Sequence, residues 1–386
     1  MALAQGNLVA TRILAEVTPG VTPAAAMTTL NTTSSKLTPN ITSTTSTTIR
    51  SDRMVSDLVH TAGSSTFDIG FELRFSEYLP LIESALAGTT STLFTLTATD
   101  ISASAVDNSI NSFAAAFSTV NILPGHWLKI KGLAQGTRIG KVVSVTTAKI
   151  VLSHVTLTTE AAGASVTVAG RSVRNGTTKK TFTVEHQFTD LTNVFESSVG
   201  QIVNTFNLNA ASGAIVTGTF GMMGRAITYG AATVGTGAPS AVGTEGIMSG
   251  VANVSTLYID GALLTGTFVK SSNLSVTANA RNLDAIGNLY PVDINLGSVG
   301  AVISAQLYFA DATYLNKFVN GTELSVAYTF TDAAGNVMVV DVPRAKLSAG
   351  SNTGAALNAD VLNDITMTSL ASTTLPYQIQ ISLLPA

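Results

Sequence analysis

The chain contains no cysteine in 386 residues. This absence excludes a disulfide scaffold, a thiolate metal site and a cysteine nucleophile. It also fits a protein that is assembled in a reducing cytosol, where disulfides are rare.

Charged and aromatic residues are scarce as well, at 11% and 6% of the chain, although 45% is hydrophobic. No apolar run approaches the roughly 18 residues that a membrane helix needs. The N-terminus lacks the basic start that precedes the apolar run of a signal peptide, and we expect no membrane association. A weakly charged, rather apolar chain must cover its surface, and subunit interfaces are depleted in charge at their centres. The composition therefore favours self-association.

Motifs for catalysis and ligand binding are also missing. The four histidines (His60, His126, His154 and His186) are scattered without metal-ligand spacing. No HExxH, GxSxG or GxxxxGK[ST] pattern occurs, and no lysine follows the glycines of the loop at residues 230–250. We expect a protein that is not an enzyme and that has no catalytic residues, no cofactor and no metal.

What the chain does have is threonine, serine, alanine and glycine in short alternating segments, a composition typical of strands and turns. Glu323–Thr331 and Asn336–Val342, for example, are predicted to pair around the turn at residues 333–335. The predicted fold class is mainly β, a sandwich-like or barrel-like body with one or two short flanking helices and an inserted small β domain.

The clearest local pattern lies in residues 49–88, which hold nine of the charged residues. Thr66–Phe75 alternates apolar and polar residues and predicts a half-buried strand. A short helix is predicted over residues 77–87, with Ser76 as N-cap and Gly88 in the left-handed position after the last turn. A second helix is predicted over residues 312–319, capped by Asp311.

Net charge changes sharply along the chain. Residues 126–184 carry nine basic side chains and one acidic one, whereas the segments on both sides are acidic overall. Short strands at regular spacing fill the same region. We therefore predict an inserted small basic β domain at residues 95–179, within a discontinuous body formed by residues 1–94 and 180–386.

The basic side chains of this insert allow two interpretations. They could form a binding face, with Trp127 as a stacking residue, or a solvated strand face, with Trp127 in a small core. The residues concerned are Lys129, Lys131, Arg138, Lys141, Lys149, Arg171, Arg174, Lys179 and Lys180.

Residues 17–48 form a tract of threonine, serine and proline with little apolar periodicity. One interpretation is a flexible or disordered loop. The other is an extended arm that becomes ordered on a neighbouring subunit.

Several segments, taken in order, resemble the tail tube proteins of long, non-contractile-tailed phages of the siphovirus type. The first contains IRSDRMVSDL and FDIGFELRFSEYLPLIESALAG, and the second is FTVEHQFTDLTNVFESSVGQIVNTFNLNAASGAIVTGTFGMMGR. Shorter pieces follow at Asp260-Gly261, at Leu274–Asn279 with RNLDAIG after it, and at Asp341–Leu347. The specificity lies in their order, and residues 95–179 lie outside the common pattern.

This resemblance implies a virion structural protein, a major tail protein whose copies form rings with six subunits each. Stacked rings would form a tube that conducts genome DNA without sequence-specific binding during ejection into the host. Partners would be further copies of the chain and the tape measure, terminator and distal tail proteins. The location would be the phage tail, assembled in the host cytoplasm, with the insert on the tube exterior.

Two sets of site residues follow from this interpretation. Arg50, Asp52, Arg53 and Asp57 are predicted to lie at the subunit interface. Asp68 and Glu72, on one face of their strand, are predicted to line the channel, where negative charge repels phosphate. The alternative hypothesis is a secreted or surface β protein, of the adhesin or surface-layer type, that binds glycans.

Overall fold

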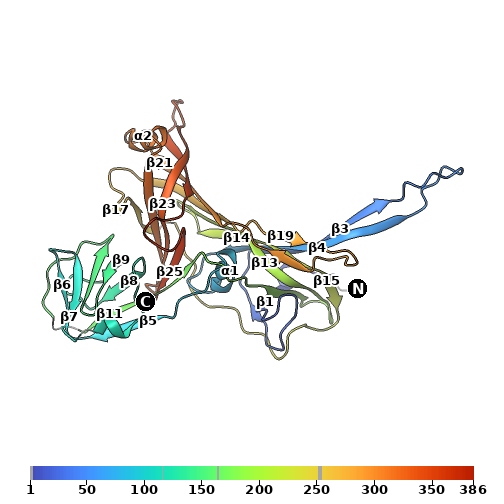
Figure 1. Ribbon diagram of the computed structural model, residues 1–386, viewed down its shortest axis with the longest axis horizontal. Coiled ribbons are helices and arrows are strands. Elements are labelled where there is room, and N and C mark those ends of the chain that lie inside the picture. Colours follow the sequence, from blue (N-terminus) through green and yellow to red (C-terminus); the bar gives the residue numbers. More distant parts are fainter. Residues whose placement is uncertain (1–2, 115, 163–164, 251–253) are drawn as a thin grey trace.

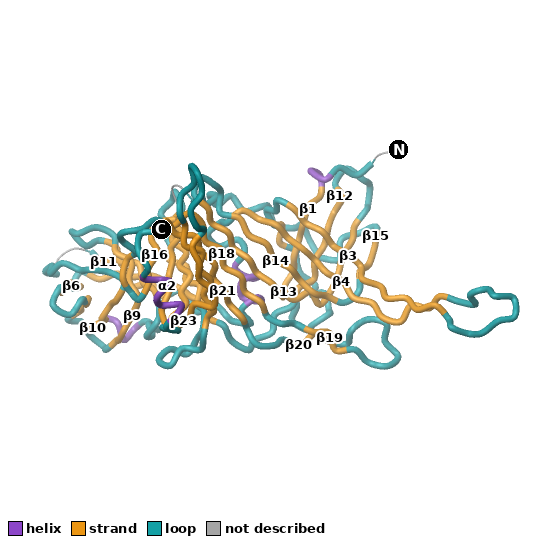
Figure 2. Tube along the Cα trace, turned by 90° about the horizontal axis from the view of Figure 1, so that it is seen from above, coloured by secondary structure: helices purple, strands orange, loops and turns teal. Residues whose placement is uncertain are grey.

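A computed structural model describes residues 3–114, 116–162, 165–250 and 254–386. Antiparallel strands dominate it, and its described part contains two short α-helices and no closed barrel. The mainly β, sandwich-like fold class is confirmed. In Figures 1 and 2 the chain forms a central body, with a small β unit at one end and a thin two-stranded arm at the other.

The elements follow one another along the chain in three groups. The first group comprises η1 (Gly6–Leu8), β1 (Val9–Ala15), β2 (Thr28–Thr29), β3 (Ser34–Thr45), β4 (Leu58–Glu72) and α1 (Leu79–Ala85). The inserted region holds β5 (Phe94–Ala98), β6 (Ile101–Ser104), β7 (Ser109–Ser112), η2 (Ala116–Thr119), β8 (Trp127–Lys131), β9 (Arg138–Val145), β10 (Lys149–Ser153) and β11 (Val166–Arg174).

The third group completes the body. It comprises β12 (Phe182–Phe188), β13 (Phe195–Ala211), β14 (Thr217–Gly224), β15 (Ile227–Gly230), β16 (Val254–Ile259), β17 (Ala262–Leu263), β18 (Val269–Thr277), β19 (Arg281–Leu283), β20 (Asp293–Asn295), β21 (Gly300–Tyr308), α2 (Thr313–Val319), β22 (Glu323–Thr331), β23 (Val337–Asn352), β24 (Leu362–Ser369) and β25 (Gln380–Leu384).

One long antiparallel sheet organises the body. Its neighbouring strands pair in the order β3, β4, β14, β13, β18, β21, β24, β23 and β22. The first half of β13 also pairs with β12 and β15, and β12 pairs with β1. Because β13 belongs to both groups of strands, it joins the two layers of the sandwich.

The main hydrophobic core lies against one face of this sheet. Rings from β4, β14 and β13 stack there, with centroids 4.8 Å apart for Phe71 and Phe220 and 4.9 Å apart for Phe206 and Phe220. Leu81 and Ile82 of α1 are buried in the same cluster. The alternation predicted for Thr66–Phe75 is confirmed, since Phe67, Ile69 and Phe71 are buried and Asp68 is exposed. However, β4 begins at Leu58 and ends at Glu72.

The predicted helix at residues 77–87 exists, but the details at its ends were wrong. α1 has no side-chain N-cap, and the hydroxyl of Ser76 instead hydrogen-bonds to Glu245. At the C-terminal end, Ala87 has the left-handed backbone (φ 47°) and Gly88 does not. The amides of Ala87 and Gly88 donate to the carbonyls of Ser84 and Glu83, which forms a Schellman motif.

Gly88 is needed because another part of the backbone approaches it closely. A Cβ atom at this position would lie 2.1 Å from the carbonyl oxygen of Arg174.

The tract at residues 17–48 is not a structureless loop, because residues 34–45 form β3. This strand pairs with β4 of its own chain, from Ser34 opposite Gly70 to Thr45 opposite Leu58. The sequence lacks apolar alternation there because both faces of the outer half of the hairpin are exposed.

Candidate assembly surfaces

The outer half of the β3–β4 hairpin projects from the body as a narrow arm (Figures 1 and 2). At its base, the amide of Gly63 donates to the carbonyl of Leu289 over 2.7 Å. A Cβ atom at Gly63 would lie 2.8 Å from the ring of Tyr290, so the body holds the arm closely at this point. Farther out, the two strands pair with each other.

All four predicted interface residues lie in the exposed loop of residues 46–57, at the tip of the arm. Within this loop, Arg50 and Asp52 pair with each other, with Nε and Oδ1 2.9 Å apart. This hydrogen bond lowers the pKa of the Asp52 carboxyl below its usual range. Asp57 accepts a hydrogen bond from the amide of Leu58. Arg53 makes no ion pair with any residue in the described ranges.

Large apolar side chains share the tip with these charges. Ile49 is 98% exposed, Val55 71% and Met54 62%, and Leu58 at the start of β4 is 58% exposed. Exposed apolar residues that occur singly are ordinary, but a group rimmed by charges is typical of an interaction surface. The loop therefore has the chemistry of a contact site.

The second surface is the face of the long sheet that points away from the core. The predicted channel residues both lie on it: Asp68 is exposed and Glu72 is half-buried. In register across β3, β4 and β14, Lys36 lies opposite Asp68, and Asp68 lies opposite Gly221.

Most side chains on this face are uncharged hydroxyls and amides, which sequence reasoning did not foresee. They alternate with core residues on six strands and include Thr66, Thr205, Asn207, Asn209, Thr217, Thr219, Asn273, Ser275, Thr277, Ser304, Gln306, Thr366 and Thr368. We call this surface the polar face. It is broad, continuous and nearly free of cations.

Three charges of the 49–88 segment belong to neither surface, Arg74, Glu77 and Glu83, and the first two bind neighbouring loops. Glu77 accepts hydrogen bonds from the amide (2.6 Å) and the side chain (3.0 Å) of Asn31. Arg74 donates to the carbonyl of Glu245, whose carboxylate in turn accepts from the amide of Ser76 over 2.7 Å. These bonds tie the N-terminal segment, the start of α1 and the 231–249 loop together. No sequence signal marked Glu245, because it lies in a Gly/Ala/Ser loop.

The basic residues of the insert do not form one binding face. Lys141 is buried and pairs with Asp341 of the body, with Nζ and Oδ2 2.8 Å apart. Lys129 is also buried, and it donates to the carbonyls of Gly335 and Pro385. Arg174 donates to Gln380 over 2.6 Å. These three cations therefore attach the insert to the body.

The remaining cations of the insert are dispersed. Lys149 pairs with Asp107, and Lys179 and Lys180 pair with Asp293 and Glu83 of the body.

Trp127 lies at the same junction and not in the insert's own small core, so that interpretation was wrong. It is 1% exposed and clusters with Ala327, Val339 and Leu384 of the body. The separate core of the insert contains residues such as Ile110, Leu128, Ile130, Ile150 and Val168. β11 spans both parts, because its first half pairs with β5 and β8 and its second half pairs with β25.

The family resemblance of the sequence segments agrees with a comparison of the chain to known protein families. The sequence model for phage tail tube proteins matches residues 6–375. The chain belongs to the phage tail tube protein family. It has no match among curated proteins. Family membership makes this protein a structural component of a viral tail that associates with its own copies and with other tail proteins.

The histidines of this tail tube protein each have a local contact. His60 and His186 bond through Nδ1 to Ser43 and Glu196, both over 2.7 Å. His126 stacks on Phe94, and His154 contacts Trp127 edge-on. Within the described ranges, no three histidine, aspartate or glutamate residues cluster in a way that could hold a metal ion.

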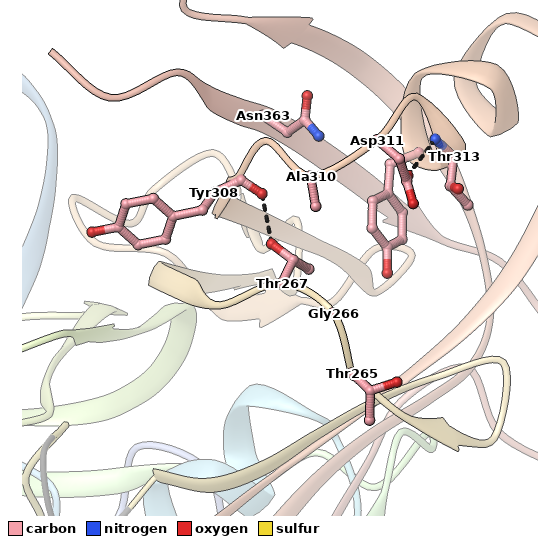
Figure 3. A pocket seen from close by; sticks show the side chains of 9 residues that line it. Thr265, Gly266, Thr267, Tyr308, Ala310, Asp311, Thr313 and Asn363 are labelled. Carbon is pink, nitrogen blue, oxygen red and sulfur yellow. Dashed lines mark hydrogen bonds between the residues drawn. The ribbon is translucent and has the colours of Figure 1, made fainter.

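A small cavity of about 190 Å³ lies beside α2 in this tail tube protein (Figure 3). Its lining includes Asn363, Tyr308 and Thr267, and the Thr267 hydroxyl donates to the Tyr308 carbonyl over 2.6 Å. The Asp311 carboxylate accepts from the amide of Thr313, the first residue of α2, over 2.8 Å, but the N-cap residue is Ala312 and it makes no side-chain capping bond, so the prediction of Asp311 as the cap was wrong. Asp311 therefore has a structural role in this cavity.

No helix in the described residues is both long and apolar enough to cross a membrane.

Proposed function

We propose that the chain is the repeating subunit of a siphovirus-type tail tube, a major tail protein with six copies in each ring. The polar face would line the channel that conducts genome DNA. The tip of the arm would contact a neighbouring subunit, and the insert would lie on the tube exterior. In the virion the tube would meet tape measure, terminator and distal tail proteins, after assembly in the host cytoplasm.

The observation that carries this proposal is the polar face itself. Proteins hold DNA through rows of lysine and arginine that displace the counterions of the phosphates. Among the described residues, the two cations that the register places on this face both have an acidic partner: Lys36 lies opposite Asp68, and Lys346, opposite Thr368, pairs with Glu323. Short uncharged side chains can donate single hydrogen bonds to phosphates but release no counterions, and the few carboxylates repel the phosphates. A duplex can therefore pass along such a wall without being held.

The edge of the same sheet supports ring closure. β3 is 12 residues long and pairs only with β4 in the described chain, so its other edge is open. A long, polar, open edge is a template for another strand. Pairing between neighbouring copies would cover it and continue the polar face around a closed ring.

Electron microscopy of the purified full-length protein tests the proposal directly. We expect rings or tubes, seeded where necessary by other tail components, and six-fold rotational averages. A chain that stays monomeric at high concentration under these conditions would refute it. Tubes whose inner wall is not the polar face would refute the assignment of Asp68 and Glu72 to the channel.

A further inference from the structure

A crevice of about 580 Å³ opens at the junction of the insert and the body, outside both assembly surfaces. Arg138 and Ile139 of β9 form one side, together with the turn at residues 154–156. Tyr258 of β16 and Leu263 of β17 form the other. Its volume is within the range of small-molecule sites, which occur preferentially where domains meet.

Aromatic rings form the inner wall of the crevice. The ring of His154 meets that of Tyr258 edge-on, with centroids 5.2 Å apart. Trp127 lies next to both, 5.0 Å from His154 and 6.0 Å from Tyr258. Burial, with Lys141 nearby, lowers the pKa of His154 to about 4. The imidazole is therefore neutral at pH 7; its Nδ1 already bonds to the Ser153 hydroxyl over 2.9 Å, which leaves Nε2 for a ligand.

Among the described residues that line the crevice, only Arg138 carries a charge. Its guanidinium makes two long hydrogen bonds, 3.4 Å to Gln135 Oε1 and 3.3 Å to the Thr137 carbonyl. None of the ion pairs formed by the described residues includes it. The neighbouring cations Lys129 and Lys141 are already bonded to the body. Arg138 is thus one cation with a planar fork of donors that suits a carboxylate.

These features restrict the chemistry of a ligand. A purely apolar molecule would leave Nε2 of His154 and the remaining donors of the Arg138 guanidinium without partners, which is costly in a closed site. A nucleic acid strand needs several cations in a row, and the described lining provides one. A sugar ring with a carboxylate suits both the aromatic wall and Arg138. Its C–H face packs on aromatic rings, its carboxylate pairs with the guanidinium, and its hydroxyls pair with polar groups.

We propose that this crevice binds an acidic monosaccharide unit, with its carboxylate on Arg138 and its ring against Tyr258 and His154. Hydroxyls of the sugar would meet Thr137 and Thr156 at the mouth of the crevice. The site is independent of tube assembly, since it uses neither the arm nor the polar face.

The single tryptophan of the chain allows a site-specific measurement, because Trp127 contacts both rings of the wall. We would titrate the full-length protein with glucuronate and follow tryptophan fluorescence and binding heat. The control ligands are glucose and acetate. Glucose has the sugar ring without the charge, and acetate has the charge without the ring. We expect saturable binding of glucuronate, and binding at least tenfold weaker for the other two, since a charged hydrogen bond is worth about that much.

The decisive variants are Arg138→Gln and Arg138→Lys. We expect the first to weaken glucuronate binding by roughly ten- to hundredfold and the second by less, because lysine keeps the charge without the fork. Arg281→Gln removes the same charge from an exposed position on β19 and should change nothing. Circular dichroism shows whether each variant is folded.

Three results would overturn the proposal. They are the absence of a saturable response to glucuronate up to roughly ten millimolar, equal affinity for glucose or acetate, and unchanged affinity in Arg138→Gln. None of these results bears on whether the protein forms tubes.

Discussion

Lys141→Met is the substitution that most directly tests how the insert is attached to the body. Lys141 and Asp341 are almost fully buried, and their charged atoms are 2.8 and 3.0 Å apart. At that distance and an effective dielectric constant of about 20, their attraction is roughly 5–6 kcal/mol before desolvation is counted. The Tyr377 hydroxyl also donates to Asp341 over 2.7 Å. Burial, together with the Asp341 charge, raises the pKa of Tyr377, so it remains a donor.

Removing one partner of a buried ion pair leaves the other charge without compensation, which costs about 3–5 kcal/mol. We expect Lys141→Met to lower the free energy of unfolding by this amount. The double variant Lys141→Met with Asp341→Leu should lose less than Lys141→Met alone, because apolar replacements of a whole buried pair are often close to neutral. Tyr377 keeps a second acceptor in that variant, the carbonyl of Gly125 at 3.2 Å.

The assay is urea unfolding of the full-length protein, followed both by Trp127 fluorescence and by far-ultraviolet circular dichroism. Trp127 lies at the junction, so its signal reports separation of the insert from the body. In the wild-type protein we expect the two signals to change together, and in Lys141→Met we expect fluorescence to change first. A double-mutant cycle gives the coupling energy. A coupling energy below about 1 kcal/mol, or two signals that still coincide in Lys141→Met, would refute the reasoning.

The remaining predictions concern the arm, the polar face, Gly88 and the response to acid. Reversing Arg50 and Arg53 to glutamate should block tube formation seen by electron microscopy and change monomer stability by less than about 0.5 kcal/mol, because both lie on an exposed loop; normal tubes would contradict the interface assignment. Thr219→Lys on β14 should leave tubes intact but make them retain DNA in a salt-dependent manner, whereas Thr219→Asp should not; tubes that behave alike in a DNA-release assay would exclude Thr219 from the channel wall. Gly88→Ala should cost more than about 1 kcal/mol in chemical denaturation, because the new methyl group collides with backbone, whereas Gly246→Ala, where nothing lies within 4 Å, is the neutral control. Burial, with Arg174 nearby, lowers the pKa of His126 to about 4, so the unfolded chain binds the extra proton between about pH 6.5 and 4 and stability falls as pH falls through that window; His126→Gln should flatten this part of the curve, and an unchanged curve would contradict the assignment.

Period-two alternation made several strands predictable because one face of each strand packs on the core. Glu323–Thr331 coincides with β22, and Thr66–Phe75 shows the expected alternation of buried and exposed side chains. β3 was not recognised from the sequence. Both faces of its outer half are exposed, so its residues do not alternate between apolar and polar. The ends of α1 were misplaced for a similar reason. The Ser76 hydroxyl donates to Glu245 instead of capping the helix, and Glu245 lies in a loop 169 residues away in the chain.

The roles of the charged residues were also only partly predictable from the sequence. The sequence grouped Arg50, Asp52, Arg53 and Asp57 as one candidate set, and the structure gathers them in one loop at the tip of the arm. It could not show that Arg74 and Glu77 are used internally. Nor could it show that Lys129 and Lys141 serve attachment instead of binding.

The sequence alone determined the β-rich class and the family, because composition, alternation and the order of segments are properties of the chain itself. Only the tertiary structure decided what each charge does. An ionisable side chain is free, paired or buried according to neighbours that come from distant strands. The register of β4, β14, β13, β18, β21 and β24 brings the hydroxyls and amides of the polar face together. Pairing between strands far apart in sequence leaves no local signal, which is why the polar face and the crevice at Arg138 could be found only in three dimensions.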